Sequence, residues 1–271
     1  MKVIFHERFY EVYTSDPAAA AGRMEAIVEA LGNDFELVKP SPASEKDVAL
    51  VHTPGQIERI KRSSDLYEIA LLSAGGAIMA AELAWNGEPA FGLIRPPGHH
   101  ASPDSCWGFC YFNNIAIAIK KLMKTGQVNS PSPFPSPPLG ERAGVRGQVK
   151  KALILDFDLH FGDGTENVFT GIPGVEYFHP ESSDRKDFVA KVQKRLEKAE
   201  GFDVLSVSAG FDRHVEDWGS LLTTEDYRTI GSLVKTYSQK FCRGRRFGVL
   251  EGGYNHDVLG YNVRAFLEGM N

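Results

Sequence analysis

Residues 154–166 read ILDFDLHFGDGTE. This stretch begins as an apolar strand, and the period-two alternation that follows sends the side chains of Asp156, Asp158 and His160 to one face. Three ionisable groups beside an apolar core are costly unless they are paired with one another or bound to a metal. Carboxylate and imidazole donors suit Zn²⁺ and related divalent ions, so the stretch predicts a metal site at a strand end. A purely structural cluster of ion pairs is the alternative.

On both sides of this stretch, short apolar runs alternate with longer amphipathic ones, which is typical of strand–helix units around a parallel sheet. We therefore expect a single α/β domain over residues 1–271. The expected strands are 3–5, 90–94, 152–156, 175–178, 204–208 and 247–250. The expected helices are 17–31, 56–62, 71–85, 114–124, 186–200, 224–241 and 256–267.

One segment differs in composition from the rest. Residues 129–147 read NSPSPFPSPPLGERAGVRG, and proline at that density forbids a helix or a central strand. A connection of roughly 2–6 residues would suffice between the flanking helix and strand. We expect an inserted, proline-rich surface loop.

Composition narrows the function classes. The net charge of -5 gives no basic surface for nucleic acid or an anionic membrane. His6, Glu7 and Arg8 interrupt the first apolar run, so we expect neither a signal peptide nor a membrane anchor. The three cysteines are expected to be reduced thiols, which together with these features indicates a cytoplasmic protein.

Three further polar clusters follow expected strands, where open parallel sheets bind their ligands. In RPPGHHA (95–101), a turn fixed by two prolines and a glycine can direct His99 and His100 into one pocket. In SAGFD (208–212), Asp212 is a candidate third metal ligand, although a helix cap would explain it equally well. In LEGGYN (250–255), paired glycines permit a close backbone approach and place Tyr254, a candidate hydrogen-bond donor to a substrate carbonyl.

Taken together, these clusters and GFCYFNNIAIA (108–118) resemble the histone deacetylase superfamily, which includes bacterial acetylpolyamine amidohydrolases. The resemblance spans most of the chain. It implies an arginase-like, three-layer α/β fold with a central, mostly parallel sheet of about eight strands flanked by helices. It also implies hydrolysis of an N-acyl amine, such as an acetyl-lysine peptide or an acetylpolyamine, by a metal-activated water.

Carried over by position, the resemblance implies one zinc ion per chain, held by Asp158, His160 and Asp212. A structural potassium ion is implied against Asp156, Asp158 and His160, largely through backbone oxygens. Both ions would thus share the turn after the strand at 152–156.

The catalytic groups follow from the same resemblance. His100 would be the general base and acid, and His99 its electrostatic partner, oriented by Asp163 and Asp156 respectively. Tyr254 would hold the oxyanion.

The implied substrate contacts are Gly108, Phe109 and Gly252, with Asp65 as the nearby acid able to hold a substrate backbone or amine. The resemblance implies a substrate tunnel lined by two aromatic residues, of which Phe109 is one. No phenylalanine follows His179, where the second is often found. Polyamine-selective relatives place an acidic gatekeeper shortly after the third zinc ligand, and the corresponding residue here is Gly219. A wider pocket is therefore expected.

Two alternatives stay open. A two-metal ureohydrolase shares the fold but needs further bridging aspartates, at places where this chain has His99 and His100. A catalytically silent acyl-amine binding protein would need no general base. The resemblance does not specify the oligomeric state.

Overall fold

The computed structural model describes residues 1–125 and 148–271, and its centre is a parallel sheet. In the described residues the sheet has seven strands in the order β2-β1-β3-β7-β6-β4-β5, all pairs parallel. Their bounds are β1 Lys2–Ile4, β2 Glu36–Val38, β3 Ala90–Gly92, β4 Ala152–Asp156, β5 Val175–Phe178, β6 Val204–Ala209 and β7 Arg246–Leu250. The expected class is confirmed, with seven strands where about eight were expected.

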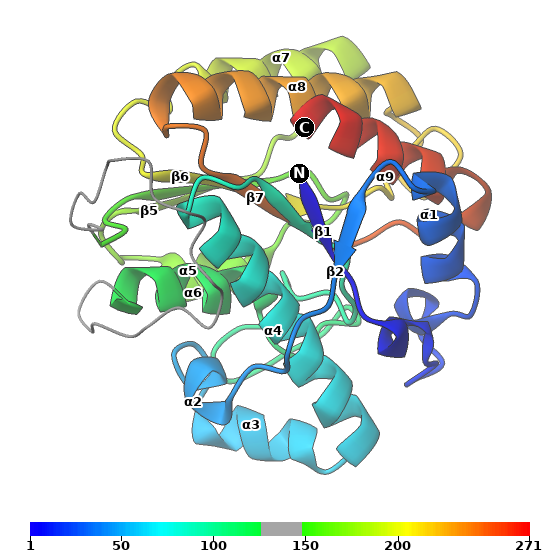
Figure 1. Ribbon diagram of the computed structural model, residues 1–271, viewed down its shortest axis with the longest axis vertical. Coiled ribbons are helices and arrows are strands. Elements are labelled where there is room, and N and C mark those ends of the chain that lie inside the picture. Colours follow the sequence, from blue (N-terminus) through cyan, green and yellow to red (C-terminus); the bar gives the residue numbers. More distant parts are fainter. Residues whose placement is uncertain (126–147) are drawn as a thin grey trace.

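Helices cover both faces of the sheet (Figure 1). One layer contains α1 (Arg23–Leu31), α7 (Arg185–Leu196), α8 (Thr224–Phe241) and α9 (His256–Met270). The other contains α4 (Ser64–Trp85) and α5 (Asn114–Thr125), with the short helices α2 (Glu45–Val48), α3 (Pro54–Lys61) and α6 (Asp163–Phe169). Two 3₁₀ turns, Glu7–Tyr10 and Pro17–Ala19, precede α1.

The central strands are apolar on both sides because both faces are covered. Every residue of β3, β4, β6 and β7 is buried. The edge strand β2 is short and largely exposed, which is why its sequence carries no strand pattern.

Several helix boundaries differ from expectation for local reasons. The helix expected at 17–31 is divided because Gly22 adopts φ 84°, a left-handed conformation that ends the first turn before α1 begins. Helix α4 begins at Ser64 rather than at 71, so its polar first turns were missed. The proline-rich loop expected at 129–147 lies outside the described residues.

Helix α4 is long and apolar enough to cross a membrane by length and composition alone. However, 72% of its apolar window is buried inside the fold, and it packs against β1, β3 and β7. These contacts are typical of a core helix.

The sheet order explains where the polar clusters meet. Strands β3, β7, β6 and β4 are consecutive neighbours, and the four polar clusters follow their carboxyl ends. Because all strands run parallel, these four loops gather at one edge of the sheet.

Candidate active site

The expected metal ligands converge at this edge. Asp158, His160 and Asp212 each offer a ligand atom, and these atoms all lie within 4.8 Å of one another. His160 Nδ1 is 3.3 Å from Asp158 Oδ1 and 3.2 Å from Asp212 Oδ2. Both carboxylates are buried, and Asp212 Oδ2 has no hydrogen-bond partner among the described residues.

The electrostatics of this trio call for a cation. Burial and the neighbouring charge of Asp158 raise the pKa of Asp212 to about 6. The contact with Asp158 and the nearby carboxylate of Asp212 raise the pKa of His160 to about 10. The two buried carboxylates of Asp158 and Asp212 therefore favour positive charge beside Nδ1 of His160. An Asp/His/Asp set with one unpartnered oxygen fits a divalent ion such as Zn²⁺.

The tandem histidines lie beside the trio, each held by its own carboxylate. The Nδ1–H of His99 donates to Asp156 Oδ2 at 3.0 Å, and that of His100 to Asp163 Oδ1 at 2.7 Å. The two rings are 4.1 Å apart, centroid to centroid. These donations leave Nε2 of each ring as the acceptor in the neutral form.

The two histidines have opposite charge preferences. Burial lowers the pKa of His99, but Asp158 and Asp156 outweigh it, so this pKa stands well above its ordinary value. Burial and the positive charge on His99 lower the pKa of His100 to about 4, against the opposing effect of Asp163. His100 is therefore neutral at neutral pH and able to accept a proton.

Tyr254 forms another wall of the site. Its ring stacks on Trp218 with centroids 4.0 Å apart and meets Phe109 edge-on at 5.9 Å. Burial and the charges of Asp158 and Asp212 raise the pKa of Tyr254 well above its ordinary value. The phenol thus stays protonated and can donate a hydrogen bond.

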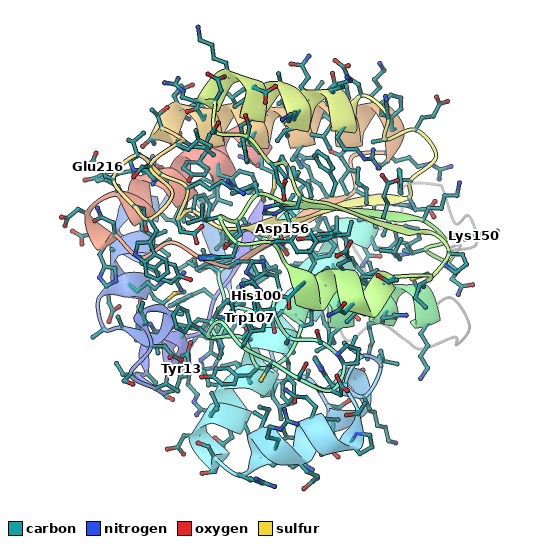
Figure 2. The ribbon with its side chains drawn as sticks, turned by 180° about the vertical axis from the view of Figure 1, so that it is seen from behind. Tyr13, His100, Trp107, Lys150, Asp156 and Glu216 are labelled. Atoms are coloured by element: carbon teal, nitrogen blue, oxygen red, sulfur yellow. The ribbon has the colours of Figure 1, made fainter. Side chains whose placement is uncertain are left out.

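These groups surround a cavity of about 120 Å³. Its lining residues are Pro97, His99, His100, Trp107, Gly108, Phe109, His160, Trp218, Gly252 and Tyr254. Figure 2 shows Asp156, His100 and Trp107 grouped in the middle of the molecule, whereas Glu216 lies at its edge.

Asp65 does not line the cavity. It is an exposed residue in the first turn of α4, where Ser64 Oγ donates to its Oδ1 at 3.2 Å. The structure therefore brings together every site residue expected from the sequence except Asp65.

Gly108 is required by both space and backbone conformation, and Gly252 by space alone. Gly108 has φ 60°, and a Cβ there would lie 2.5 Å from His100 Cδ2. A Cβ at Gly252 would lie 2.6 Å from Asp158 Oδ2 and 2.7 Å from Asp212 Oδ2. Any larger residue at Gly108 would displace the His100 ring, and at Gly252 the carboxylates of Asp158 and Asp212.

Two tryptophans were missed by sequence reasoning. Trp107 lies over His100 with ring centroids 3.8 Å apart, and its Nε1–H donates to Asp163 Oδ2 at 2.9 Å. Trp218 lines the cavity together with Phe109. It is the second aromatic residue, which was expected to follow His179. Both lie in loops, where no periodicity distinguishes a site residue from a surface residue.

Glu251 was also missed as a structural support. Its carboxylate accepts the backbone N–H of Gly98 at 2.7 Å and of His99 at 3.2 Å, and the Ser208 hydroxyl at 3.1 Å. Burial raises the pKa of Glu251 to about 7. A buried acid directly after strand β7 was the available signal.

Comparison with known proteins is consistent with this geometry. A probable deacetylase of Methanothermobacter thermautotrophicus is 29% identical over 325 residues, covering 99% of this chain and 90% of the relative. A histone deacetylase-like amidohydrolase of Pseudomonas aeruginosa is 28% identical over 319 residues, covering 94% and 78%. The crystal structure of the HDA15 HD domain shares the fold, with a TM-score of 0.78, 21% identity, and coverage of 98% of this chain and 88% of that one. The histone deacetylase domain family matches residues 18–130 and 177–270, and the chain therefore belongs to the histone deacetylase family, whose members hydrolyse amides.

Proposed function

We propose that this protein is a zinc-dependent deacylase that hydrolyses an N-acyl amine, such as an acetyl-lysine peptide or an acetylpolyamine. One observation carries the proposal: the unpartnered Asp212 Oδ2 lies in a three-ligand cluster beside a neutral histidine and a protonated tyrosine. The relatives named deacetylase and amidohydrolase support the same reaction class.

Asp158, His160 and Asp212 would hold the zinc ion. When bound, Zn²⁺ supplies Lewis-acid polarisation and makes water nucleophilic near neutral pH. Three protein ligands are the number that catalytic zinc sites use, and they would leave room for a water.

His100 moves the proton in this proposal. Its Nε2 accepts a proton from the attacking water while Nδ1–H stays bonded to Asp163. The same nitrogen then gives the proton to the departing amine. His99, whose pKa is raised, places positive charge beside the developing negative charge.

Tyr254 stabilises the oxyanion. Its hydroxyl donates to the substrate carbonyl oxygen as negative charge grows there. Stacking on Trp218 holds the ring, and Asp217 fixes the backbone by accepting the N–H of Tyr254 and of Asn255, each at 2.8 Å. Asp217 thus supports the loop that carries Tyr254.

The neutral His100 argues against a silent binding protein, because a binder needs no proton acceptor. The two-metal ureohydrolase is disfavoured because it needs further bridging aspartates, and this chain has His99 and His100 at those places.

A competition screen tests the proposal. Zinc-loaded protein is offered an acetyl-lysine peptide, acetylputrescine, acetylspermidine and small amides, and release of the free amine is measured. Turnover of at least one substrate, abolished in His100→Ala, is expected. Absence of turnover on every acyl amine, with zinc bound, would contradict the deacylase function.

A further inference from the structure

The side chain of Arg213 binds the turn that carries two of the expected metal ligands. Its Nε–H donates to the carbonyl oxygens of Phe157 and Asp158 at 3.2 and 2.9 Å, and its Nη2 donates to the Leu159 carbonyl at 3.2 Å. Three consecutive carbonyl groups therefore converge on one cation. Arg213 is 6% exposed, so water competes little for these bonds.

The guanidinium is also packed on its other sides. Its Nη2 lies 2.9 Å from His179 Nε2, and its central carbon lies 4.8 Å from the centroid of the Phe188 ring. An arginine side chain keeps its charge in proteins. A fixed positive charge thus occupies the space beside the turn.

The potassium ion implied by the family resemblance would use backbone oxygens of the same turn, including that of Asp158. That oxygen already accepts from Arg213. The side-chain oxygens of Asp156 are engaged as well, Oδ1 by the Asp158 N–H at 3.1 Å and Oδ2 by Tyr177 at 2.9 Å and His99 at 3.0 Å. A second cation a few ångströms from a buried guanidinium would be repelled. These residues do not fit a potassium ion.

We propose that Arg213 replaces the structural potassium ion with a cation belonging to the chain itself. The guanidinium fixes the turn at 157–159, so the fold does not depend on a monovalent ion. The inference rests on the proposed function only in treating Asp158 and His160 as metal ligands.

The arrangement also ties the ligands of two strands together. The Leu159 N–H donates to Asp212 Oδ1 at 3.0 Å, while Arg213, the next residue, binds the carbonyls on either side of Asp158. Neighbouring residues after β6 thus hold the N–H and C=O groups of the turn after β4. These hydrogen bonds fix the distance between Asp158 and Asp212.

The test is thermal unfolding of the metal-free protein in potassium chloride and in choline chloride at equal ionic strength. The wild type is expected to unfold at the same midpoint in both salts. An ion present at ~100 times its Kd would change the unfolding equilibrium constant about 100-fold, so a wild-type midpoint that rises with potassium would overturn the proposal. This measurement does not require any variant to fold.

Arg213→Ala gives the complementary result. In choline chloride it is expected to unfold at a lower temperature than the wild type, and potassium or millimolar guanidinium should partly restore the midpoint. A variant that responds to neither cation would overturn the proposal.

Arg246→Ala is the matched control. Arg246 is 3% exposed and donates to the carbonyls of Met270 and Gly244, away from the site. Its loss should destabilise the fold without any response to potassium, and an equal potassium response in both variants would overturn the proposal. Because the readout is unfolding without divalent metal, failure of the deacylase assignment would leave this result unaffected.

Discussion

Replacing Tyr254 with phenylalanine removes one hydroxyl and leaves the surrounding packing in place. The ring contacts with Trp218 and Phe109 involve only the aromatic face and edge. The hydroxyl makes no hydrogen bond within the described part of the chain that would be left broken. The variant therefore isolates the hydroxyl that is proposed to stabilise the oxyanion.

Tyr254→Phe is expected to lower kcat strongly and to change KM and the free energy of unfolding only slightly. Removing one oxyanion donor typically costs about 2.7–4 kcal/mol of transition-state stabilisation, or roughly 10²–10³-fold in kcat. KM should change little, because the bond strengthens only as charge develops on the carbonyl oxygen. The free energy of unfolding should stay within about 0.5 kcal/mol of the wild type.

The assay is steady-state hydrolysis of the best substrate from the competition screen, with urea unfolding on the same samples. Tyr261→Phe is the matched control, since Tyr261 lies on α9 and is 64% exposed. A Tyr254→Phe enzyme with wild-type kcat, or one that loses activity only through a raised KM, would refute the assigned role.

Three further perturbations test other parts of the account. Trp107→Phe keeps a ring over His100 but loses the N–H donated to Asp163. Because a hydrogen bond to a charged group contributes about 1.5 kcal/mol, kcat should fall by about tenfold. An unchanged kcat would contradict a positioning role. Gly252→Ala places a Cβ against the carboxylates of Asp158 and Asp212, so a Co²⁺ absorbance titration should show weaker binding, and wild-type affinity would count against the proposed ligands. Burial lowers the pKa of His52 to about 4, below the unfolded value of about 6.5; its contribution to stability is present above pH ~6.5 and declines by about 3 kcal/mol as pH falls toward 4. Urea unfolding of His52→Gln should show a flatter pH dependence than the wild type, and parallel curves would rule out this origin.

Much of the fold was predictable because its strongest signals are periodic. Strand β4 and strand β5 coincide with the expected ranges, as does helix α8, where Thr223 and Asp226 form a capping box. Edge strand β2 was missed because its three residues, two of them exposed, show no alternation. Helix α6 was missed because it begins within a glycine-containing ligand loop at Asp163.

The site was predictable to the extent that its residues follow strands. The loops after β3, β4, β6 and β7 each carry a polar cluster, and the parallel sheet brings them together. Trp107, Trp218 and Arg213 were missed since their roles depend on loop paths rather than on spacing. Asp65 was predicted to contact the substrate, but it lies outside the cavity lining.

In the proposed function, Asp158, His160 and Asp212 hold a single zinc ion on which amide hydrolysis depends. The most direct measurement is metal content and turnover on one preparation, before and after chelation, for the wild type and Asp212→Ala. We expect one zinc per wild-type chain, activity that is lost on chelation and returns with zinc, and neither tight zinc binding nor turnover in Asp212→Ala. Turnover that persists in the chelated protein, or two zinc ions per chain, would contradict the proposal.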